Sequence, residues 1–217
     1  MIRNVLIIGA GDSAAELLDH LVQTKLVSLN KNKLFVYDTK LKNRFVLLNL
    51  FKKINFINDI NKIPLKIGLK AIISNGEPLV REKYFKILLK KKIGLFSLIH
   101  PNSTISKTAK IGKGVVIYPQ TVVGPFANIK DNVFINCGSV IGHHSEIGQN
   151  SVISPNSFMG GNSKLGINCF MGANSNIYPG VRVGKRSKLT SGSSLNTNIK
   201  ESCLAHGNPA KPKFFDF

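Results

Sequence analysis

The sequence predicts a parallel β-helix preceded by a Rossmann-like α/β domain. An aliphatic or Met residue recurs at every sixth position from Ile99 to Leu195, and a small or β-branched residue stands four places after each one. A period of six is neither the roughly 3.6 of an α-helix nor the alternation of a β-strand, and hexapeptide repeats are typical of parallel β-helices. A third observation, an apolar run that ends in a glycine-rich turn near the N-terminus, predicts the α/β domain.

The repeats also predict how each coil is built. Three repeats of six residues make one coil, so the seventeen repeats that start at Ile99 give between five and six coils. The bulky residue of each repeat is expected to fill the interior, and the small residue to fit a crowded corner. Glycine often stands at the second position, as at Gly112 and Gly124, where it relieves the turn.

The α/β domain is predicted to cover residues 1–98, and the β-helix residues 99–217 with a short C-terminal tail. Asn4–Ile8 reads as a strand, 9–14 as the glycine-rich turn, and the apolar-periodic segment to about Val22 as a helix. The later elements are three strands, one helix and a short run that leads into the first coil, at 34–38, 54–57, 71–74, 78–91 and 94–98.

Two features near the ends of the predicted strands point to ligand binding. Asp38 ends the second strand, and the polar turn Asn75–Gly76 follows a later one. Both are expected at the carboxyl edge of the sheet, where open α/β sheets bind ligands. The glycine-rich turn alone leaves the question open, because close helix–strand packing needs such a turn with or without a bound phosphate.

The amino-acid composition limits the class of protein and the compartment that we expect. The formal net charge of +19 is spread through both halves of the 217 residues without an aromatic-studded basic stripe, so we expect a solvated surface or steering of phosphorylated small ligands rather than nucleic-acid binding. Cys137, Cys169 and Cys203 fit neither a disulfide framework nor a metal cluster, which favours the cytoplasm. No apolar run approaches 18 residues and residues 1–11 lack a signal-peptide cleavage pattern, so no membrane insertion is expected.

The repeat pattern resembles the left-handed β-helix acyltransferases. The order of the two domains, with the junction 97–101 and the exit 207–211, resembles the hexapeptide-repeat sugar acyltransferases that include sialic acid O-acetyltransferases and UDP-4-amino-sugar N-acetyltransferases. This resemblance implies a left-handed β-helix, a homotrimer, acetyl-CoA as the acyl donor without a metal, and a nucleotide-sugar substrate used in surface polysaccharide biosynthesis.

The resemblance places the chemistry in residues 135–145. His143 aligns with the general base of the family, which needs to remove a proton from the incoming amine or hydroxyl. Family members carry an acidic residue at the next position, where this chain has His144. Three explanations stay open. Glu146 takes the place of that acid, or His143 is a weaker base than its counterpart in the family, or another residue orients its ring. One coil further on, Gly161 stacks beside His143, and the resemblance implies that its N–H holds the oxyanion.

The resemblance also implies two sets of binding residues. Those for acetyl-CoA are Val152, Gly161, Ala173 and Ser191, although a histidine is often found at the position of Val152. Those for the nucleotide sugar are Gly11, Asp12, Ser13, Tyr37 and Asp38. The polar turn Asn75–Gly76, inferred above from its place after a strand, completes this set. Asp12 departs from the family pattern, because an anion beside a pyrophosphate is unfavourable unless its side chain turns away as a helix cap.

These expectations lead to one main hypothesis and three alternatives. The main hypothesis is an acetyl-CoA-dependent N-acetyltransferase that acts on a nucleotide-linked amino sugar with His143 as the base. An O-acetyltransferase on a sialic-acid-like sugar would use the same machinery. A non-catalytic nucleotide-sugar-binding scaffold is a different class, favoured by the departures at Asp12, His144 and Val152. A β-helix metal enzyme like carbonic anhydrase would need three zinc-binding histidines, and the coils contain only His143 and His144.

Overall fold

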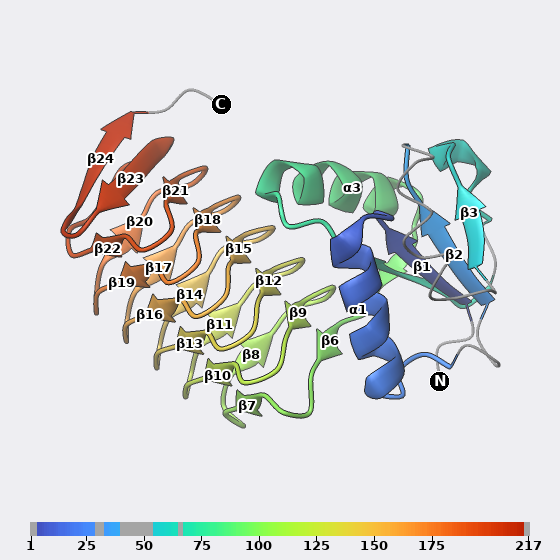
Figure 1. Ribbon diagram of the computed structural model, residues 1–217, viewed down its shortest axis with the longest axis horizontal. Helices are drawn as coiled ribbons and strands as arrows, with labels where there is room; N and C mark the ends of the chain where they lie inside the picture. The colour runs from blue at the N-terminus through green and yellow to red at the C-terminus, as the bar shows by residue number, and fades with distance from the viewer. Residues whose placement is uncertain (1–3, 29–32, 40–53, 65–66, 215–217) are drawn as a thin grey trace. The chain divides into compact units, whose positions relative to one another are not determined.

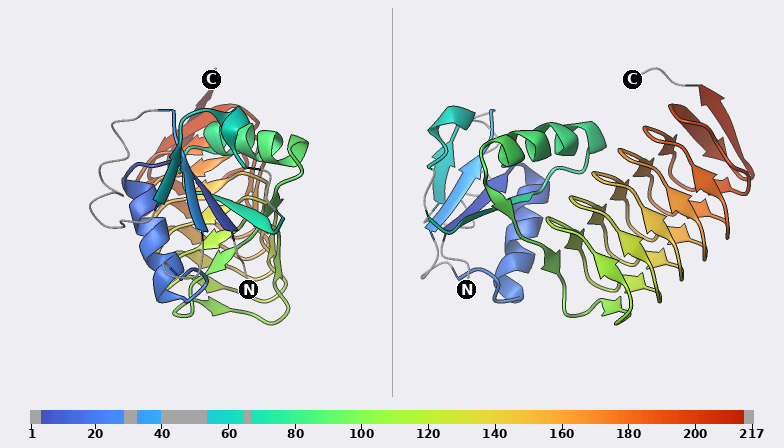
Figure 2. Two further views of the ribbon diagram at one scale, coloured as in Figure 1. Left: turned by 90° about the vertical axis from the view of Figure 1, so that its right-hand side faces the viewer. Right: turned by 180° about the vertical axis from the view of Figure 1, so that it is seen from behind.

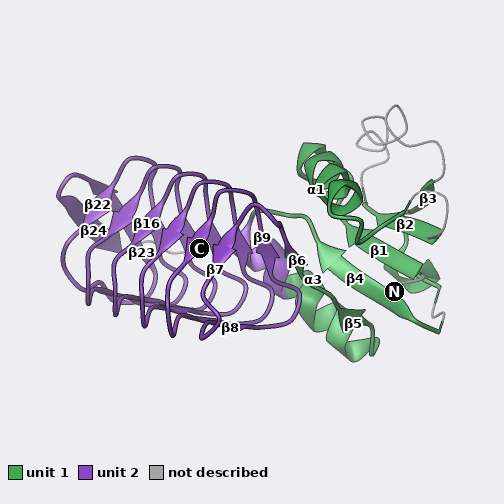
Figure 3. Cartoon of the chain, turned by 90° about the horizontal axis from the view of Figure 1, so that it is seen from below, with its two compact units in different colours: residues 1–76, 83–98 green, residues 77–82, 99–217 purple. Residues whose placement is uncertain are grey.

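The computed structural model describes residues 4–28, 33–39, 54–64 and 67–214. The chain divides into two compact units, which are coloured separately in Figure 3. Unit 1 comprises residues 1–76 and 83–98, and unit 2 comprises residues 77–82 and 99–217. Among the described residues, no helix combines the length and the apolar character needed to cross a membrane.

Unit 2 is a parallel β-helix, as the hexapeptide repeat predicted, and it is left-handed, as the resemblance implied. Its two-residue strands stack into three parallel sheets that follow one another around each coil (Figure 1; Figure 2, right). Strands of successive coils pair in an 18-residue register, as in Val122 with Val140 and Val140 with Phe158. The first sheet contains β6 (Leu98–Ile99), β9 (Val116–Ile117), β12 (Phe134–Ile135), β15 (Val152–Ile153), β18 (Phe170–Met171) and β21 (Lys188–Leu189).

The other two sheets continue the same coils. The second contains β7 (Thr104–Ile105), β10 (Val122–Val123), β13 (Val140–Ile141), β16 (Phe158–Met159), β19 (Asn176–Ile177) and β22 (Ser194–Leu195). The third contains β8 (Lys110–Ile111), β11 (Asn128–Ile129), β14 (Glu146–Ile147), β17 (Lys164–Leu165) and β20 (Arg182–Val183). The antiparallel strands β23 (Cys203–Gly207) and β24 (Ala210–Phe214) extend the first sheet beyond β21, and this pairing covers its edge.

The repeated aliphatic residues fill the interior of the β-helix. From Ile117 to Leu195 each of them is buried, and together they form one continuous core. Ile105 and Ile111 are partly buried against that core, whereas Ile99 is 40% exposed. Ile99 departs from the prediction because it belongs to the first coil, which has no preceding coil to cover it.

Several of the small residues have a second role besides fitting the corner. A serine hydroxyl donates a hydrogen bond to the carbonyl fifteen residues later, as in Ser151 Oγ to Gly166 O at 2.7 Å and Ser157 Oγ to Gly172 O at 3.0 Å. The same Ser151 Oγ accepts the N–H of Cys169 at 3.0 Å. At such positions serine satisfies buried backbone groups between coils that an alanine of similar size would leave without partners. The hydroxyls of Ser163 and Ser175 lack such a partner, so at those positions small size alone explains the residue.

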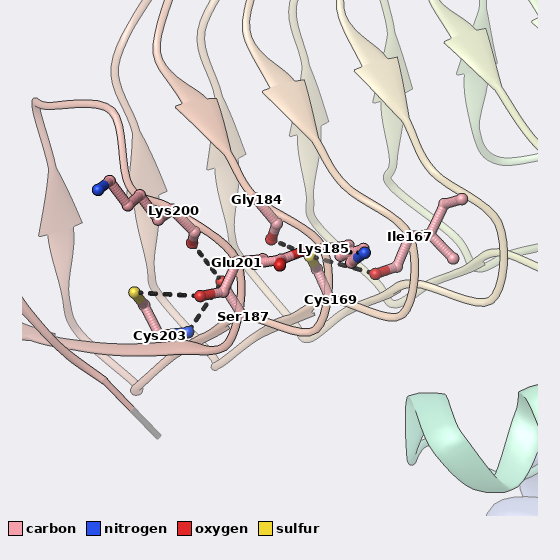
Figure 4. Close-up of polar contacts among 8 residues, drawn as sticks. All are labelled: Ile167, Cys169, Gly184, Lys185, Ser187, Lys200, Glu201 and Cys203. Carbon is pink, nitrogen blue, oxygen red and sulfur yellow. Dashed lines mark hydrogen bonds and ion pairs between the residues drawn. The ribbon is translucent and has the colours of Figure 1, made fainter. Parts of the chain in front are cut away.

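Cys169 occupies one of these serine positions (Figure 4). Its thiol donates to Gly184 O at 3.1 Å, in the pattern that the serines follow with oxygen. On the next coil, Ser187 Oγ donates to Lys200 O and accepts the N–H of Cys203 at 3.1 Å. Burial raises the pKa of the Cys169 thiol to about 12, so it stays protonated at neutral pH and acts as a packing residue.

A second column of polar side chains lies at the corner between the third and first sheets. Asn132 Nδ2 donates to Asn150 Oδ1, and Asn150 Nδ2 donates to Asn168 Oδ1, each at 2.9 Å. Arg81 ends the ladder on one side, because its guanidinium donates to the backbone and side-chain oxygens of Asn132 at 2.9 and 2.8 Å. Glu82 ends it on the other by accepting from Asn168. The ladder therefore fixes residues 77–82 to the β-helix.

Arg81 is fully buried, and burial lowers its pKa to about 9. This value is still above neutral pH, so the side chain remains a charged donor. Its guanidinium also lies 5.5 Å from the ring centroid of Phe134, close enough for a cation–π contact. These contacts compensate part of the cost of burying the charge.

Unit 1 is built on a five-stranded parallel sheet in the order β3-β2-β1-β4-β5. Its interior is formed by apolar residues of these strands and of α3, such as Leu6, Ile73 and Leu88. The elements of this part of the chain are β1 (Asn4–Ile8), α1 (Asp12–Gln23), β2 (Lys33–Tyr37), β3 (Ile54–Ile57), the 3₁₀ turn η2 (Ile60–Lys62), β4 (Leu69–Ile73), α3 (Pro78–Lys90) and β5 (Gly94–Leu95).

The prediction of a separate Rossmann-like α/β domain is wrong. The protein is a β-solenoid, and its described residues contain only the two α-helices α1 and α3. Between β3 and β4 the described residues supply the single 3₁₀ turn η2 where such a domain would place a helix. The first residues of α3 also group with the β-helix through the asparagine ladder. The glycine-rich turn is a local signal and does not specify a whole domain.

Replacing Ser151 by Ala is expected to lower the free energy of unfolding by about 1–2 kcal/mol, because Gly166 O and the N–H of Cys169 both lose a buried partner. Cys169→Ser is the matched control, since it keeps a donor for Gly184 O, and it should change stability less. Urea unfolding followed by circular dichroism measures both. Equal losses in the two variants would contradict the role assigned to the hydroxyl.

Replacing Arg81 by Leu is expected to destabilise the protein by about 2–4 kcal/mol, because two buried oxygens of Asn132 lose their charged donor. Lys90→Ala, at an exposed position of the same helix, should have little effect. Urea unfolding measures the free energy of unfolding of both variants. If Arg81→Leu is as stable as the wild type, the contacts of Arg81 with the ladder add no stability.

Candidate functional site

His143 and His144 lie in the turn between β13 and β14, with both side chains exposed. Backbone hydrogen bonds fix this turn to both neighbouring coils: the N–H of His144 donates to Pro125 O at 2.9 Å, and the N–H of Asn162 donates to His143 O at 2.8 Å. His144 has a positive φ of 58°, in the left-handed region where Asn or Gly stands at most equivalent turns. The β-helix thus presents two imidazoles on a rigid corner.

The imidazole of His143 lies directly against Gly161 on the next coil. A Cβ atom added to Gly161 would come within 2.5 Å of Nε2 and 2.6 Å of Cε1 of His143. Any larger residue at this position would push the ring away, so glycine is required for the observed placement. Among the described residues, the N–H of Gly161 donates no backbone hydrogen bond, whereas its carbonyl accepts from Gly180.

The two imidazoles also contact each other. Nδ1 of His143 lies 3.2 Å from Nδ1 of His144, so one of these nitrogens carries the hydrogen and the other accepts it. The ring of Phe126, from the preceding coil, stacks on His144 with centroids 4.9 Å apart and planes inclined by 30°. Phe126, His144 and Asn162 are spaced 18 residues apart and form one column along the corner.

A groove of about 500 Å³ runs beside His144, within the size range of small-molecule sites. It combines an aromatic side, polar amides and several charges, from Thr108, Lys110, Phe126, Asn128, His144, Glu146, Asn162, Lys164 and Arg182. Lys164 Nζ lies 2.8 Å from Glu146 Oε1, and this hydrogen bond and its charge hold the pKa of Glu146 below the usual range. Glu146 is therefore paired with Lys164, while the ring nitrogen of His143 contacts His144.

The residues predicted to bind acetyl-CoA do not all lie together in one chain. Ala173 and Ser191 are adjacent on successive coils, where the N–H of Gly192 donates to Ala173 O, but at a different corner from Gly161. Val152 lies on β15 and is only 3% exposed. Its side chain is therefore buried in this chain, and its role in binding acetyl-CoA stays a prediction.

The residues predicted to bind the nucleotide sugar meet at the carboxyl edge of the sheet in unit 1. Gly11 precedes α1, and Asp12 and Ser13 are its exposed first residues. Asp38 follows β2, and its Oδ2 accepts the N–H of Ala10 at 2.9 Å. The carboxylate of Asp38 therefore orders the glycine-rich turn, whatever else it binds.

Two further contacts shape this edge. Gly9 has a φ of +107°, and a Cβ there would lie 2.5 Å from Ser74 Oγ, so the turn packs tightly against the end of β4, just before Asn75 and Gly76. Tyr37 packs edge-on against Tyr84, with centroids 5.6 Å apart. Burial, and then Tyr84, raise the pKa of Tyr37 to about 12, so its hydroxyl stays a neutral donor.

Phe126, Asn162, Lys110 and Lys164 were not singled out as site residues from the sequence. The 18-residue coil length would have found Phe126 and Asn162, because each stands one coil from His144. Lys110 and Lys164 share no local motif with the histidines. The described residues contain no group of three His, Cys, Asp or Glu side chains that could hold a metal, so they offer no ligand set for the metal-enzyme alternative.

Comparison with known proteins shows what this chain is similar to. Residues 87–183 match a family model described as the GMPPB C-terminal domain. No curated protein matches the sequence. PerB from Caulobacter crescentus, solved with CoA and GDP-perosamine, superposes with a TM-score of 0.85 at 24% identity over 98% of each chain.

Two more solved structures share the fold. The acetyltransferase domain of PglB from Neisseria gonorrhoeae has a TM-score of 0.79 at 21% identity, over 97% of this chain and 100% of that one. WeeI from Acinetobacter baumannii AYE has a TM-score of 0.71 at 18% identity, again over 97% and 100%. The chain thus has the β-helix fold of hexapeptide-repeat sugar acyltransferases, and the resemblance seen in its sequence is confirmed at the level of fold.

Replacing Gly161 by Ala is expected to displace the imidazole of His143, because the added methyl group would overlap the ring. The NMR signals of the His143 ring should move, while the melting temperature changes little, since an exposed side chain can swing aside. Gly180→Asn is the control: no atom lies within 4 Å of its Cβ position, and Asn tolerates the positive φ. Unchanged His143 signals in Gly161→Ala would contradict the packing described.

Proposed function

We propose that the protein is an acetyl-CoA-dependent N-acetyltransferase that acts on a nucleotide-linked amino sugar. The observation that carries this proposal is the exposed imidazole of His143, which lies against Gly161 and contacts His144, and His144 lines a groove of substrate size. A base and an adjacent backbone donor are what acyl transfer from a thioester requires.

His143 acts as the general base in this mechanism. The sugar nitrogen attacks the thioester carbon, and Nε2 of His143 accepts the proton that the nitrogen loses. The N–H of Gly161 donates to the oxygen that becomes negative in the tetrahedral intermediate. The carbon–sulfur bond then breaks, the amide forms, and the CoA sulfur takes a proton from the imidazolium.

The similar structures support the choice of substrates. PerB was crystallised with CoA and GDP-perosamine, and so were variants of that enzyme in which one histidine is replaced by Asn or Ala. The PglB domain was crystallised with acetyl-CoA. For this chain, we assign the nucleotide sugar to Gly11, Asp12, Ser13, Tyr37, Asp38, Asn75 and Gly76 at the sheet edge of unit 1.

The separation of the CoA residues favours a homotrimer. Gly161 lies at one corner of the β-helix, and Ala173 and Ser191 lie at another. A CoA molecule that lies along one corner of a single chain therefore cannot contact all three residues. We propose that acetyl-CoA binds between β-helices, with Gly161 from one copy and Ala173 and Ser191 from its neighbour. The cytoplasmic location remains a prediction from composition.

Replacing His143 by Ala is expected to lower the rate of acetyl transfer by about 10²–10⁴-fold, because the general base is lost. Thiol release from acetyl-CoA, measured with a panel of UDP-, CMP-, GDP- and dTDP-linked amino sugars, reports the rate. Binding of the nucleotide sugar, followed by thermal shift, should persist in the variant.

Mass spectrometry of the product distinguishes N- from O-acetylation. If the wild-type protein binds a nucleotide sugar but releases no thiol with any of the panel, the scaffold hypothesis replaces the enzyme. If His143→Ala retains the wild-type rate, His143 is not the base.

A further inference from the structure

We propose that His144 is a positioning residue: its neutral imidazole, stacked on Phe126, accepts a hydrogen bond from Nδ1 of His143 and so leaves Nε2 of His143 free as the base. This inference rests on the proposed function, because it explains how the base is oriented in a chain that lacks the acidic neighbour. It assigns to a neutral ring the orienting role that a carboxylate would otherwise have.

The geometry indicates which ring nitrogen of His143 carries the hydrogen and which one carries the lone pair. Nδ1 of His143 lies 3.2 Å from Nδ1 of His144, whereas Nε2 of His143 lies on the side of Gly161. In a neutral imidazole one nitrogen carries the hydrogen and the other the lone pair. With the hydrogen on Nδ1 and donated to His144, the lone pair of His143 is on Nε2, next to the backbone donor assigned to the oxyanion.

His144 is well held for this role. Its N–H donates to Pro125 O at 2.9 Å, its backbone adopts the left-handed conformation with φ of 58°, and Phe126 stacks on its ring at 4.9 Å. A stacked ring on a fixed backbone has few alternative orientations. The acceptor nitrogen therefore stays in place while the substrates come and go.

The nearest carboxylate does not take over this role. Glu146 is the single carboxylate among the residues that line the groove with His144. It pairs with Lys164 at 2.8 Å, whereas Nδ1 of His143 contacts the ring of His144.

The experiment compares His144→Asn with His144→Leu. Asn tolerates the positive φ and keeps a carbonyl acceptor that does not titrate, whereas Leu has no acceptor. We expect kcat of the Leu variant to fall by about 10–100-fold with little change in KM for acetyl-CoA, and the Asn variant to recover most of that loss.

Gln120→Leu is the matched control, because Gln120 has a φ of 60°, is exposed at another corner, coils away from Ala173, and donates its N–H across coils in the same way. It should keep the wild-type kcat. If Leu and Asn at position 144 lower kcat equally, or if Leu lowers only the melting temperature, the role assigned to His144 is wrong.

A readout without activity separates this proposal from the proposed function. Nitrogen-15 NMR of the imidazoles should show His143 in the Nδ1–H form in the wild type and in His144→Asn, and a mixture of tautomers in His144→Leu. A wild-type protein with no transferase activity but with this tautomer pattern would overturn the function and keep the positioning. The same tautomer mixture in all three proteins would overturn the positioning alone.

Discussion

The 18-residue register between coils is the constraint on which the rest of this structure depends. Each coil is too short to be stable by itself, because its two-residue strands find their hydrogen-bond partners only on neighbouring coils. The register also brings the same position of successive coils into contact, which builds the apolar interior and the asparagine ladder, and it places serine hydroxyls beside carbonyls of the next coil. A side chain at any corner is consequently fixed by the residues 18 before and 18 after it.

The candidate site is a direct product of this register. Phe126, His144 and Asn162 form one column, and His143 faces Gly161 because both occupy the same position of successive coils. Since the backbone of the turn is hydrogen-bonded on both sides, the imidazoles are held without any loop having to close over them. In the proposed function, this rigid frame orients the base before the substrates arrive, which would be the entropic part of its contribution to catalysis.

The same spacing organises the polar contacts within the β-helix. These contacts explain why particular polar residues stand at positions where size alone would allow an apolar one. Serine at the corner satisfies a carbonyl fifteen residues later, and Cys169 performs the same task with its thiol. Asn132, Asn150 and Asn168 pass hydrogen bonds from coil to coil until Arg81 and Glu82 end the series. The buried charge of Arg81 is tolerated because the ladder presents oxygens to it at the right distance.

The sequence by itself determined the β-helix, its interior and the stacking of Gly161 beside His143, because a strict period of six leaves one way to bury every sixth residue. It did not determine the architecture of the N-terminal part, since a glycine-rich turn reports a local strand-to-helix connection and not the number of helices around a sheet. Only the tertiary structure showed that Val152 is buried, that Glu146 pairs with Lys164, and that His144 lies between Phe126 and His143. The 18-residue spacing identifies which residues are neighbours, but the contacts also depend on the direction of each side chain, which the sequence pattern does not encode.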